Sequence, residues 1–402
     1  MKDSINQLLH KFEQKFKKID LGLDRIYSFM DVIGRPHLSL PTTIHLAGTN
    51  GKGSTIAFLK AMIEAAGKTC HVYTSPHLVN FNERIQIRGR DIEDRYLLEL
   101  LQFVDSVSEN SNLTYFELTT AAAFKAFADN PADFLLLETG LGGRLDATNI
   151  VPPPKLCLFT PISFDHMEYL GESLKQIATE KAGIIKDGSI CLTAPQKPEV
   201  LEVLFSKAPD LIIADADYKM PELSLAGEHQ RTNALLAMEA AKTLGINERA
   251  ILKGLTTAKW RARMQKLTKG ELPSILPEGA ELWLDGAHND AGAEVIAKHI
   301  SANNGKPWVM ICGMMKTKDS RAYLRHFIGK VRNIYTIDIP GEPNAKAAHE
   351  LAMVARSLAF NTTASESALD AVQKILAIHR GNVNILITGS LYLAGRILEK
   401  NS

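Results

Sequence analysis

Residues 43–55 read TIHLAGTNGKGST, and this stretch decides the fold of the first part of the chain. Its β-branched, apolar beginning predicts a buried strand, and a loop with three glycines leads from it into a helix expected from Ser54. Glycines let backbone N–H groups converge on phosphate oxygens, where a β-carbon would block the approach. The helix N-terminus adds its dipole and unpaired donors, and Lys52 adds a cation. The stretch is typical of a phosphate-binding loop; a glycine-rich turn without a ligand is the alternative.

Short apolar runs alternate with amphipathic stretches on either side of this loop. We expect strands at 43–47, 70–74, 133–138, 156–160, 189–193 and 211–214, and helices at 54–66, 97–108 and 116–129. Runs that are apolar on both faces and alternate with helices are typical of a parallel sheet covered by helices.

The pattern restarts near Glu281. Strands are expected at 281–285, 308–312, 333–338 and 383–388, with helices at 290–302, 321–328, 346–358 and 366–379. The glycine- and proline-rich stretch 268–279, TKGELPSILPEG, is the expected linker. We therefore predict an α/β protein with two domains: an N-terminal P-loop-type domain with a mostly parallel sheet (1–267), which binds ATP, and a smaller C-terminal Rossmann-like α/β domain (280–402).

Composition narrows the class of protein. A length of 402 residues exceeds what one hydrophobic core usually supports, which agrees with two domains. A net charge of +1 gives no sign of a nucleic-acid surface, and no apolar run approaches the roughly 20 residues of a membrane span. The four cysteines are scattered without a CxxC pair, and the N-terminal residues predict an amphipathic helix rather than a signal peptide. We expect a cytoplasmic protein with reduced thiols.

Polar side chains follow two of the expected strands. Glu138 ends the strand at 133–138, at the sheet edge where α/β proteins bind ligands. A carboxylate there is a natural magnesium ligand, with a helix-capping or surface glutamate as the alternative. His166 follows the strand at 156–160, although imidazole is an unusual ligand for magnesium.

Glu180 and Lys181 read most simply as an exposed acid–base pair on a helix.

The second domain offers two further candidates. The strand in 282–289, LWLDGAHN, ends at Asp285, whose carboxylate suits the hydroxyls of a ribose. Asn289 is a candidate helix N-cap in the same stretch. The sequence 260–264, WRARM, supplies an arginine near the expected linker that could reach a γ-phosphate.

Ten motifs in order resemble one family. They are AGTNGKGS, TSPHL, NERI, TYFELTT, ETGLGGRLDATN, SFDHMEYLG, EKAGI, GEHQRTNA, LDGAHN and GSLYL, between about Asp20 and Tyr392. The chain resembles the bacterial folylpolyglutamate synthase/dihydrofolate synthase enzymes, a branch of the Mur-ligase-like superfamily.

The resemblance implies a set of site residues. ATP would be bound by Thr49, Asn50, Gly51, Lys52, Gly53, Ser54, Asn233, Arg263, Asp285 and His288. Two magnesium ions would be held by Ser75, Glu138, His166 and, if carbamylated, Lys181. Lys52, Lys181, His166 and Arg263 would serve catalysis, and a monovalent cation such as K⁺ is an expected further cofactor.

Three segments resemble the dihydropteroate site of the bifunctional bacterial enzymes. Their residues are Asp20, Leu21, Gly22, Leu23, Thr114, Tyr115, Phe116, Glu117, Leu145, Asp146 and Ala147. An aromatic side chain in the second segment would suit stacking on a flat pterin. One departure concerns the arginine loop, where Arg261 and Ala262 replace the family's Pro-Gly before Arg263. Either Arg261 or Arg263 could then be the phosphate ligand.

We predict an ATP-dependent ligase that adds L-glutamate to dihydropteroate and to folate polyglutamate tails through an acyl phosphate. A synthase that only extends folate tails is one alternative. A Mur-type ligase with a UDP-linked substrate is another, although the phosphate loop begins only at Gly48 and leaves no preceding domain for that substrate. A nucleotide switch would need no amino-acid acceptor. The expected partners are small molecules, with no nucleic acid or membrane, and the expected state is a monomer.

Overall fold

A computed structural model describes residues 1–16, 19–109, 111–215, 218, 220–303, 305–379 and 381–401. The chain divides into two compact units. Unit 1 comprises 1–224 and 231–258, and unit 2 comprises 225–230 and 259–402. The expected linker, 268–279, lies inside unit 2.

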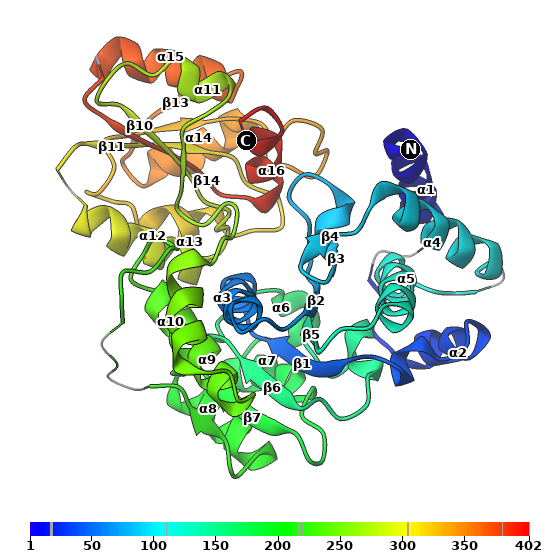
Figure 1. The fold of residues 1–402 in the computed structure, drawn as a ribbon. Coiled ribbons are helices and arrows are strands. Elements are labelled where there is room, and N and C mark those ends of the chain that lie inside the picture. Colours follow the sequence, from blue (N-terminus) through cyan, green and yellow to red (C-terminus); the bar gives the residue numbers. More distant parts are fainter. Residues whose placement is uncertain are drawn as a thin grey trace. The chain divides into compact units, whose positions relative to one another are not determined.

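Unit 1 is built around a sheet of eight strands among its described residues, in the order β4-β3-β2-β5-β1-β6-β7-β8 (Figure 1). The strands are β1 (Thr42–Ala47), β2 (Cys70–Tyr73), β3 (Ile85–Ile87), β4 (Arg90–Asp91), β5 (Phe134–Glu138), β6 (Leu156–Phe159), β7 (Ile190–Thr193) and β8 (Ile212–Ile213). All pairs from β2 to β8 are parallel, whereas β3 and β4 join antiparallel at one edge. The expected mostly parallel sheet is confirmed, and the antiparallel edge was not anticipated.

Helices cover this sheet. They are α1 (Lys2–Lys15), α2 (Asp24–Val32), η1 (Pro36–Leu38), α3 (Lys52–Ala65), η2 (Phe81–Arg84), α4 (Asp94–Val107), α5 (Tyr115–Asp129), η3 (Ala147–Ile150), α6 (Met167–Leu170), α7 (Leu174–Ala182), α8 (Pro198–Lys207), α9 (Gln230–Thr243) and α10 (Glu248–Thr257).

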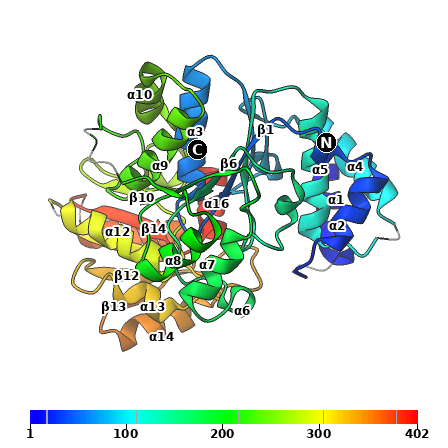
Figure 2. The same cartoon turned by 90° about the horizontal axis from the view of Figure 1, so that it is seen from below.

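The core of unit 1 explains why these helices form. Helices α1, α4 and α5 direct apolar residues into one cluster with β2 and β5, while α7 and α8 pack into a second cluster with β6 and β7. Helix α3 is buried on nearly all sides because it packs on the sheet and on α10 (Figure 2). The element that carries the glycine-rich loop is therefore fixed between strand and helix.

Unit 2 contains a smaller sheet of six described strands in the order β13-β12-β11-β14-β10-β9. The strands are β9 (Gln265–Leu267), β10 (Glu281–Leu284), β11 (Trp308–Cys312), β12 (Asn333–Thr336), β13 (Asn361–Ala364) and β14 (Asn384–Thr388). The helices are α11 (Glu271–Ser274), α12 (Asp290–Ala302), α13 (Ser320–Arg325), α14 (Ala348–Ser357), α15 (Ala368–His379) and α16 (Leu391–Lys400). Only β9 pairs antiparallel, on β10. This agrees with the expected Rossmann-like α/β domain.

Two expectations from composition can be compared with the structure. All four cysteines are free thiols in buried positions. None of the helices that the structure describes has both the length and the apolar character needed to cross a bilayer.

Candidate active site

The loop after β1 is shaped by two glycines. Gly48 has φ +153°, and a Cβ there would lie 1.9 Å from Thr160 Oγ1. Gly51 has φ +93°, and a Cβ there would lie 2.3 Å from Asn233 Oδ1. Backbone with positive φ is accessible to glycine at little cost. The close packing at both positions favours a built binding loop over a loose glycine-rich turn.

Some backbone amides of the loop donate to other parts of the protein, and those at the start of α3 have no acceptor within the helix. The N–H groups of Thr49 and Asn50 both donate to the carbonyl of Pro161, at 3.0 and 3.3 Å. The hydroxyl of Thr49 donates to Ser163 O at 3.0 Å. The first amides of an α-helix have no acceptor within the helix. Because α3 begins at Lys52, two residues before the expected Ser54, the amides of its first turn are the candidate donors to a bound phosphate.

Lys52 and Glu138 meet at the end of the phosphate loop. Lys52 Nζ donates to the carbonyls of Gly48 (3.1 Å) and Thr49 (3.4 Å) and lies 3.6 Å from Glu138 Oε1. The other carboxylate oxygen of Glu138 accepts the Ser75 amide at 3.3 Å. The Glu138 side chain is only 8% exposed, so the surface-glutamate alternative is wrong. Lys52, Ser75 and Glu138 thus lie together, as the sequence predicts.

His166 occupies a different setting. It is the N-cap residue of α6 with φ +50°, and its side chain is 43% exposed. Its Nε2 lies 4.0 Å from Asp165 Oδ1. Across the described residues, no three His, Cys, Asp or Glu side chains converge closely enough to hold a metal ion. A divalent cation at Glu138 would therefore take most of its ligands from hydroxyls, water and phosphate oxygens, which is the preference of Mg²⁺.

Lys181 is buried rather than exposed. It lies in α7, is 5% exposed, and its Nζ donates to Gly48 O at 2.9 Å. Burial, and to a lesser extent the charge of Lys52, lowers the pKa of Lys181 to about 7. Glu180 turns away to pair with Arg144 at 2.9 Å. The exposed acid–base pair that the sequence favoured is wrong, because the two side chains separate and the lysine enters the core.

The three pteroate-like segments lie together in unit 1. Arg25 connects two of them: its guanidinium donates to the Asp20 carbonyl and lies 3.3 Å from Glu117 Oε1. Leu23, Tyr115 and Phe116 pack against the same hydrophobic cluster that contains Ala147 of the third segment. Arg25 was not selected from the sequence, although it stands two residues after the first segment.

Two carboxylates of these segments shape the backbone. Glu117 accepts the Thr114 amide at 2.6 Å, while Thr114 Oγ1 accepts the Glu117 amide at 3.2 Å, which caps α5. Asp146 accepts the amides of Leu141 (2.7 Å) and Thr148 (3.0 Å) and caps η3. Burial raises the pKa of the Asp146 carboxyl. Both acids therefore fix the geometry of the segments that carry them.

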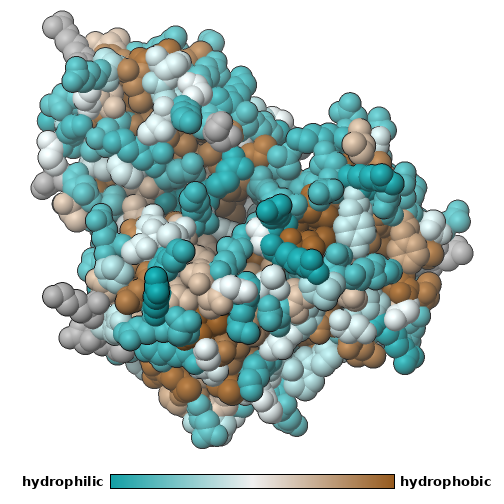
Figure 3. Space-filling model, in the orientation of Figure 1, coloured by the Kyte–Doolittle hydropathy of each residue, from teal (hydrophilic) through white to brown (hydrophobic). Residues whose placement is uncertain are grey.

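A hollow adjoins these segments. Its volume is about 510 Å³, and its described lining includes Arg25, Phe29, Val32, Val107 and Leu113. Apolar side chains gather on the surface over α2 and α4, at the right-hand edge of Figure 3. There Val32 and Val107 are exposed. The lining also includes Ser28, Ser106, Glu109, Ser111 and Asn112, so the hollow suits a flat group that carries polar edges.

In unit 2, Arg263 lies near enough to Asp285 for its charge to act on the Asp285 carboxyl. Asp285 is 5% exposed and accepts the amides of Met264 (2.7 Å) and Ala287 (2.8 Å). Burial raises the pKa of the Asp285 carboxyl, while the nearby Arg263 opposes that rise. Arg263 donates to Ala262 O at 2.8 Å, and His288 Nδ1 donates to Gly286 O at 3.0 Å. The expected N-cap is confirmed as well, since Asn289 accepts the Gly292 amide at 2.9 Å.

The arginine loop keeps a left-handed turn despite its unusual sequence. Ala262 has φ +54° and is fully buried. A left-handed conformation costs an alanine roughly 1–2 kcal/mol. The Ala262 amide donates to Gln265 Oε1 (2.9 Å), and its carbonyl accepts the Gly286 amide (3.0 Å). These bonds hold the turn where the family pattern has glycine.

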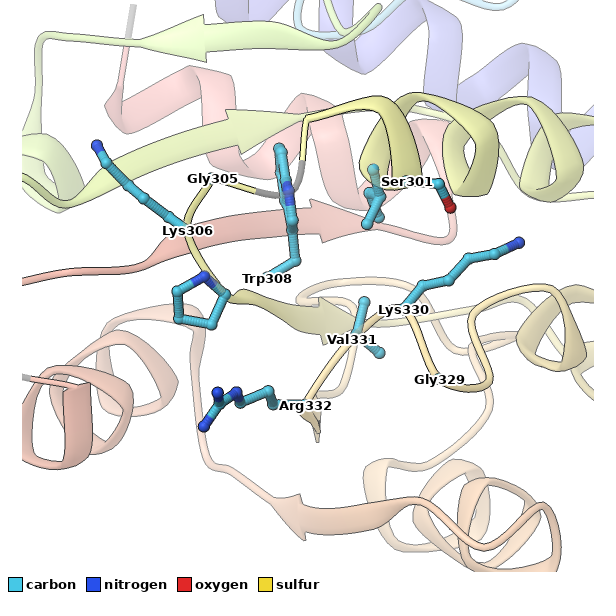
Figure 4. Close-up of a pocket in the computed structure, with 10 residues that line it drawn as sticks. Ser301, Gly305, Lys306, Trp308, Gly329, Lys330, Val331 and Arg332 are labelled. Atoms are coloured by element: carbon cyan, nitrogen blue, oxygen red, sulfur yellow. The ribbon is translucent and has the colours of Figure 1, made fainter.

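A second depression in unit 2 does not form a comparable site. Its volume is about 530 Å³, and its lining includes Lys306, Lys330 and Arg332 beside Trp308. Figure 4 shows these three cationic side chains pointing away from one another. Lys306 is bound to Gly279 O (2.8 Å) and Glu281 Oε1 (3.3 Å). The depression therefore offers no convergent set of donors.

Comparison with known proteins agrees with this geometry. Two family models match the chain: the Mur ligase middle domain over residues 46–194 and the C-terminal domain of dihydrofolate synthetase over residues 270–400. The fold and these matches define a Mur-ligase-like, ATP-dependent ligase.

Full-length relatives specify the family. The chain is 33% identical to the dihydrofolate synthase/folylpolyglutamate synthase of Bacillus subtilis over 94% of both chains. It is 30% identical to that of Escherichia coli, over 95% of this chain and 92% of the relative. The chain belongs to the dihydrofolate synthase/folylpolyglutamate synthase family, as its sequence motifs predicted.

Solved structures give the same result. Folylpolyglutamate synthase from Mycobacterium tuberculosis, complexed with ADP and AMPPCP, is 29% identical with a TM-score of 0.84, over 98% of this chain and 97% of that one. E. coli FolC in complex with DHPP and ADP is 27% identical with a TM-score of 0.86, over 98% and 97%. The two-unit α/β architecture is therefore that of the family.

Proposed function

We propose that this ligase is bifunctional and adds L-glutamate both to dihydropteroate and to the polyglutamate tails of tetrahydrofolate. The observation that carries the proposal is the packing of the three pteroate-like segments on one hydrophobic cluster, with Arg25 joining two of them, next to the hollow of about 510 Å³. The E. coli relative was solved with DHPP and ADP, which supports a pterin-type acceptor in this fold.

The reaction proceeds in two transfers. The acceptor carboxylate attacks the γ-phosphorus of ATP, the bond to ADP breaks, and an acyl phosphate forms. The amine of glutamate then attacks the acyl carbon, phosphate leaves with the bonding electrons, and the amine gives up a proton. Phosphate is a far better leaving group than oxide, which is why ATP is consumed.

The chain's own residues mainly orient reactants and balance charge. The first-turn amides of α3, from Lys52 to Ser54, bind phosphate oxygens, and Lys52 neutralises their charge as it now neutralises Glu138. In unit 2, Arg263 contributes a guanidinium for the γ-phosphate. Asp285 and His288 are the proposed ligands of the ribose, and Asn233, which lies next to Gly51, is the proposed residue near the adenine.

Ser75, Glu138 and His166 are the proposed ligands of two magnesium ions, with K⁺ as a further cation. Magnesium held by these residues would withdraw charge from the phosphate oxygens of ATP. The buried carboxylate of Glu138, already paired with a cation, fits this role. A relative from Yersinia pestis, 25% identical with a TM-score of 0.85, was solved with AMPPNP and a Mn ion, which supports a divalent metal.

Lys181 is the proposed site of carbamylation. A neutral lysine amine adds to CO₂, forms an N–C bond and loses one proton, which leaves a carboxylate in place of a cation. Two observations support the proposal: Lys181 is buried beside Gly48 at the phosphate loop, and a pKa of about 7 leaves much of its amine neutral at physiological pH. The new carboxylate would be an oxygen ligand for the second magnesium.

Purified protein with ATP, magnesium, potassium and glutamate tests the function, with dihydropteroate and tetrahydrofolate supplied in separate reactions and products read by mass. A gain of one glutamate on both acceptors is expected. A gain on tetrahydrofolate alone would make the protein a tail-extending synthase. No gain on either, with ATP still bound, would favour a Mur-type acceptor, whereas ATP hydrolysis without any acceptor would favour a nucleotide switch.

Lys52→Ala and Lys60→Ala form a matched pair for this assay. Both lysines lie on α3, but Lys60 donates to Gln86 Oε1 (2.9 Å) and Gly89 O (2.7 Å), away from the phosphate loop. Lys52→Ala is expected to abolish turnover while Lys60→Ala retains it. Normal turnover by Lys52→Ala would refute the assignment of the loop.

A further inference from the structure

A histidine lies inside the central strand of unit 1. His45 is in β1 and fully buried. It pairs in register with Leu137 of β5 and Cys157 of β6, so its side chain points to the same face of the sheet as theirs. On that face its Nε2 lies 2.9 Å from Thr148 Oγ1, in η3. The strand that leads into the phosphate loop is thereby bonded to the segment that follows the third pteroate-like motif.

The hydrogen bonds of this contact have one consistent direction. Both oxygens of Asp146 accept backbone amides, from Leu141 and Thr148. The Thr148 hydroxyl therefore gives its single proton to Asp146 Oδ1. The same hydroxyl must then accept from His45, so His45 Nε2 carries the proton. The resulting path runs from His45 through Thr148 to Asp146, the residue that caps η3.

The other ring nitrogen of His45, Nδ1, is not part of this path. This atom is buried without a hydrogen-bond partner among the described residues. An unpaired buried polar atom is costly, and a phenylalanine or leucine would fill the same space without that cost. The retained bond to Thr148 is what the histidine contributes here.

The far end of the same segment is anchored separately. Lys186 Nζ donates to Asn149 O at 2.7 Å and to the carbonyl of Val151. Asp146 thus fixes the start of η3, Lys186 fixes its end, and His45 fixes its middle to the sheet. The His45 bond connects it to β1, the strand that continues through Ala47 into Gly48.

We propose that His45 is a positioning residue that sets the acceptor-binding segment Leu145–Ala147 relative to the phosphate loop. This role rests on the proposed function, because it assumes that the segment binds the pteroate acceptor. By holding this segment, His45 would set the distance between the acceptor carboxylate and the γ-phosphate of ATP. Loss of the bond frees the acceptor segment while the phosphate loop keeps its own bonds to Pro161.

Four variants test this. His45→Leu and Thr148→Val each remove the bond, His45→Gln keeps a side-chain N–H donor, and the double variant combines the first two. The matched control is His71→Leu: His71 is also fully buried in a strand of the same sheet, but its Nε2 lies 2.9 Å from Asn130 O, at the end of α5. Steady-state kinetics give kcat and the KM of each substrate, and melting curves report stability.

We expect His45→Leu and Thr148→Val each to raise the KM for dihydropteroate about tenfold and to change the KM for ATP by less than about twofold. The double variant should be no worse than Thr148→Val alone, since that variant already removes the bond to His45 together with the bond from Thr148 to Asp146. His45→Gln should recover most of the loss. His71→Leu should lower the melting temperature without this separation of the two KM values.

Other results decide against the proposal. Equal changes in both KM values, additive losses in the double variant, or the same pattern in His71→Leu would reduce His45 to a structural residue and leave the proposed function intact. No product from the wild-type protein with dihydropteroate would overturn the proposed acceptor and this positioning role together.

Discussion

Replacing Gly51 by alanine tests the phosphate loop most directly, and Gly67→Ala is its matched control. The two glycines flank the same helix, α3, with φ +93° at Gly51 and φ +75° at Gly67. A Cβ at Gly67 would meet nothing within 4 Å, whereas at Gly51 it would lie 2.3 Å from Asn233 Oδ1 and 3.2 Å from its Cγ. The pair separates backbone strain from the contact with Asn233.

The magnitudes follow from these distances. Alanine in a left-handed conformation costs about 1–2 kcal/mol, offset by about 0.4–1 kcal/mol from the stiffer unfolded chain. Gly67→Ala should therefore lose about 1 kcal/mol of stability. Gly51→Ala must also displace the buried Asn233 side chain from its rotamer, which adds about 0.5–1.5 kcal/mol. The melting temperature should fall by about 2–4 °C for Gly67→Ala and by about twice that for Gly51→Ala.

Nucleotide affinity gives the decisive readout. Gly51→Ala should weaken ATP binding about tenfold or more, because the first-turn amides of α3 and Asn233 must move together. Gly67→Ala should bind ATP like the wild-type protein. Calorimetric titration with a non-hydrolysable ATP analogue measures both. Wild-type affinity in Gly51→Ala, or an equal loss in Gly67→Ala, would refute the reasoning that this glycine shapes the site.

Further predictions concern other parts of the site. The pKa of Lys181 in the folded protein, about 7, lies below the usual value of 10.5, so the fraction of neutral amine should rise with pH through 7. The fraction of Lys181 that is carbamylated should rise with it, as measured by ¹³C NMR with labelled bicarbonate. A carbamylated fraction that falls with pH would contradict this. The same shift means that the unfolded state binds the extra proton, so this residue's contribution to stability should improve between pH 7 and 10.5 in melting curves. Arg25→Met should raise the KM for dihydropteroate about tenfold and leave the KM for ATP unchanged, because it leaves the carboxylate of Glu117 without its cation; an unchanged KM would remove Arg25 from the acceptor site. Asp285→Ala should destabilise unit 2 by about 2–3 kcal/mol, since two amides lose a buried acceptor, and a melting curve equal to the wild type would exclude that role.

Much of the fold could be predicted because its strands are buried on both faces. β11 is apolar, β5 is apolar up to Glu138, and β1 is buried from Thr43 to Ala47; the structure has all three strands within a residue of the expected bounds. The short edge strand β4, Arg90–Asp91, consists of two exposed charged residues and carries no periodic pattern. β9 was not predicted, because it is only three residues long and sequence order cannot reveal its antiparallel pairing with β10; its residues fell within the expected first domain.

A residue of the candidate site could be predicted where a side chain of suitable chemistry stands at the end of a predicted strand. Glu138 could be located because a strand end and a carboxylate stand together, and its burial with Lys52 agrees with that reading. Lys181 looked exposed because a lysine on a helix usually is, and only tertiary packing brings it to Gly48. His45 was not selected from the sequence, because its partner Thr148 lies 103 positions away and no local pattern connects them.

The two amides that Thr49 and Asn50 give to Pro161 have a consequence for binding thermodynamics. These bonds fix the loop to the residue that follows β6 by two positions, and a loop held by the protein's own bonds has little conformational entropy to lose when phosphate binds. Preorganisation of this kind is worth affinity, because each residue ordered on binding would otherwise cost about 1–2 kcal/mol. Amide hydrogen exchange at Thr49 and Asn50 should accordingly be slow in the free protein and change little with ATP, while exchange in the first turn of α3 slows when the nucleotide binds.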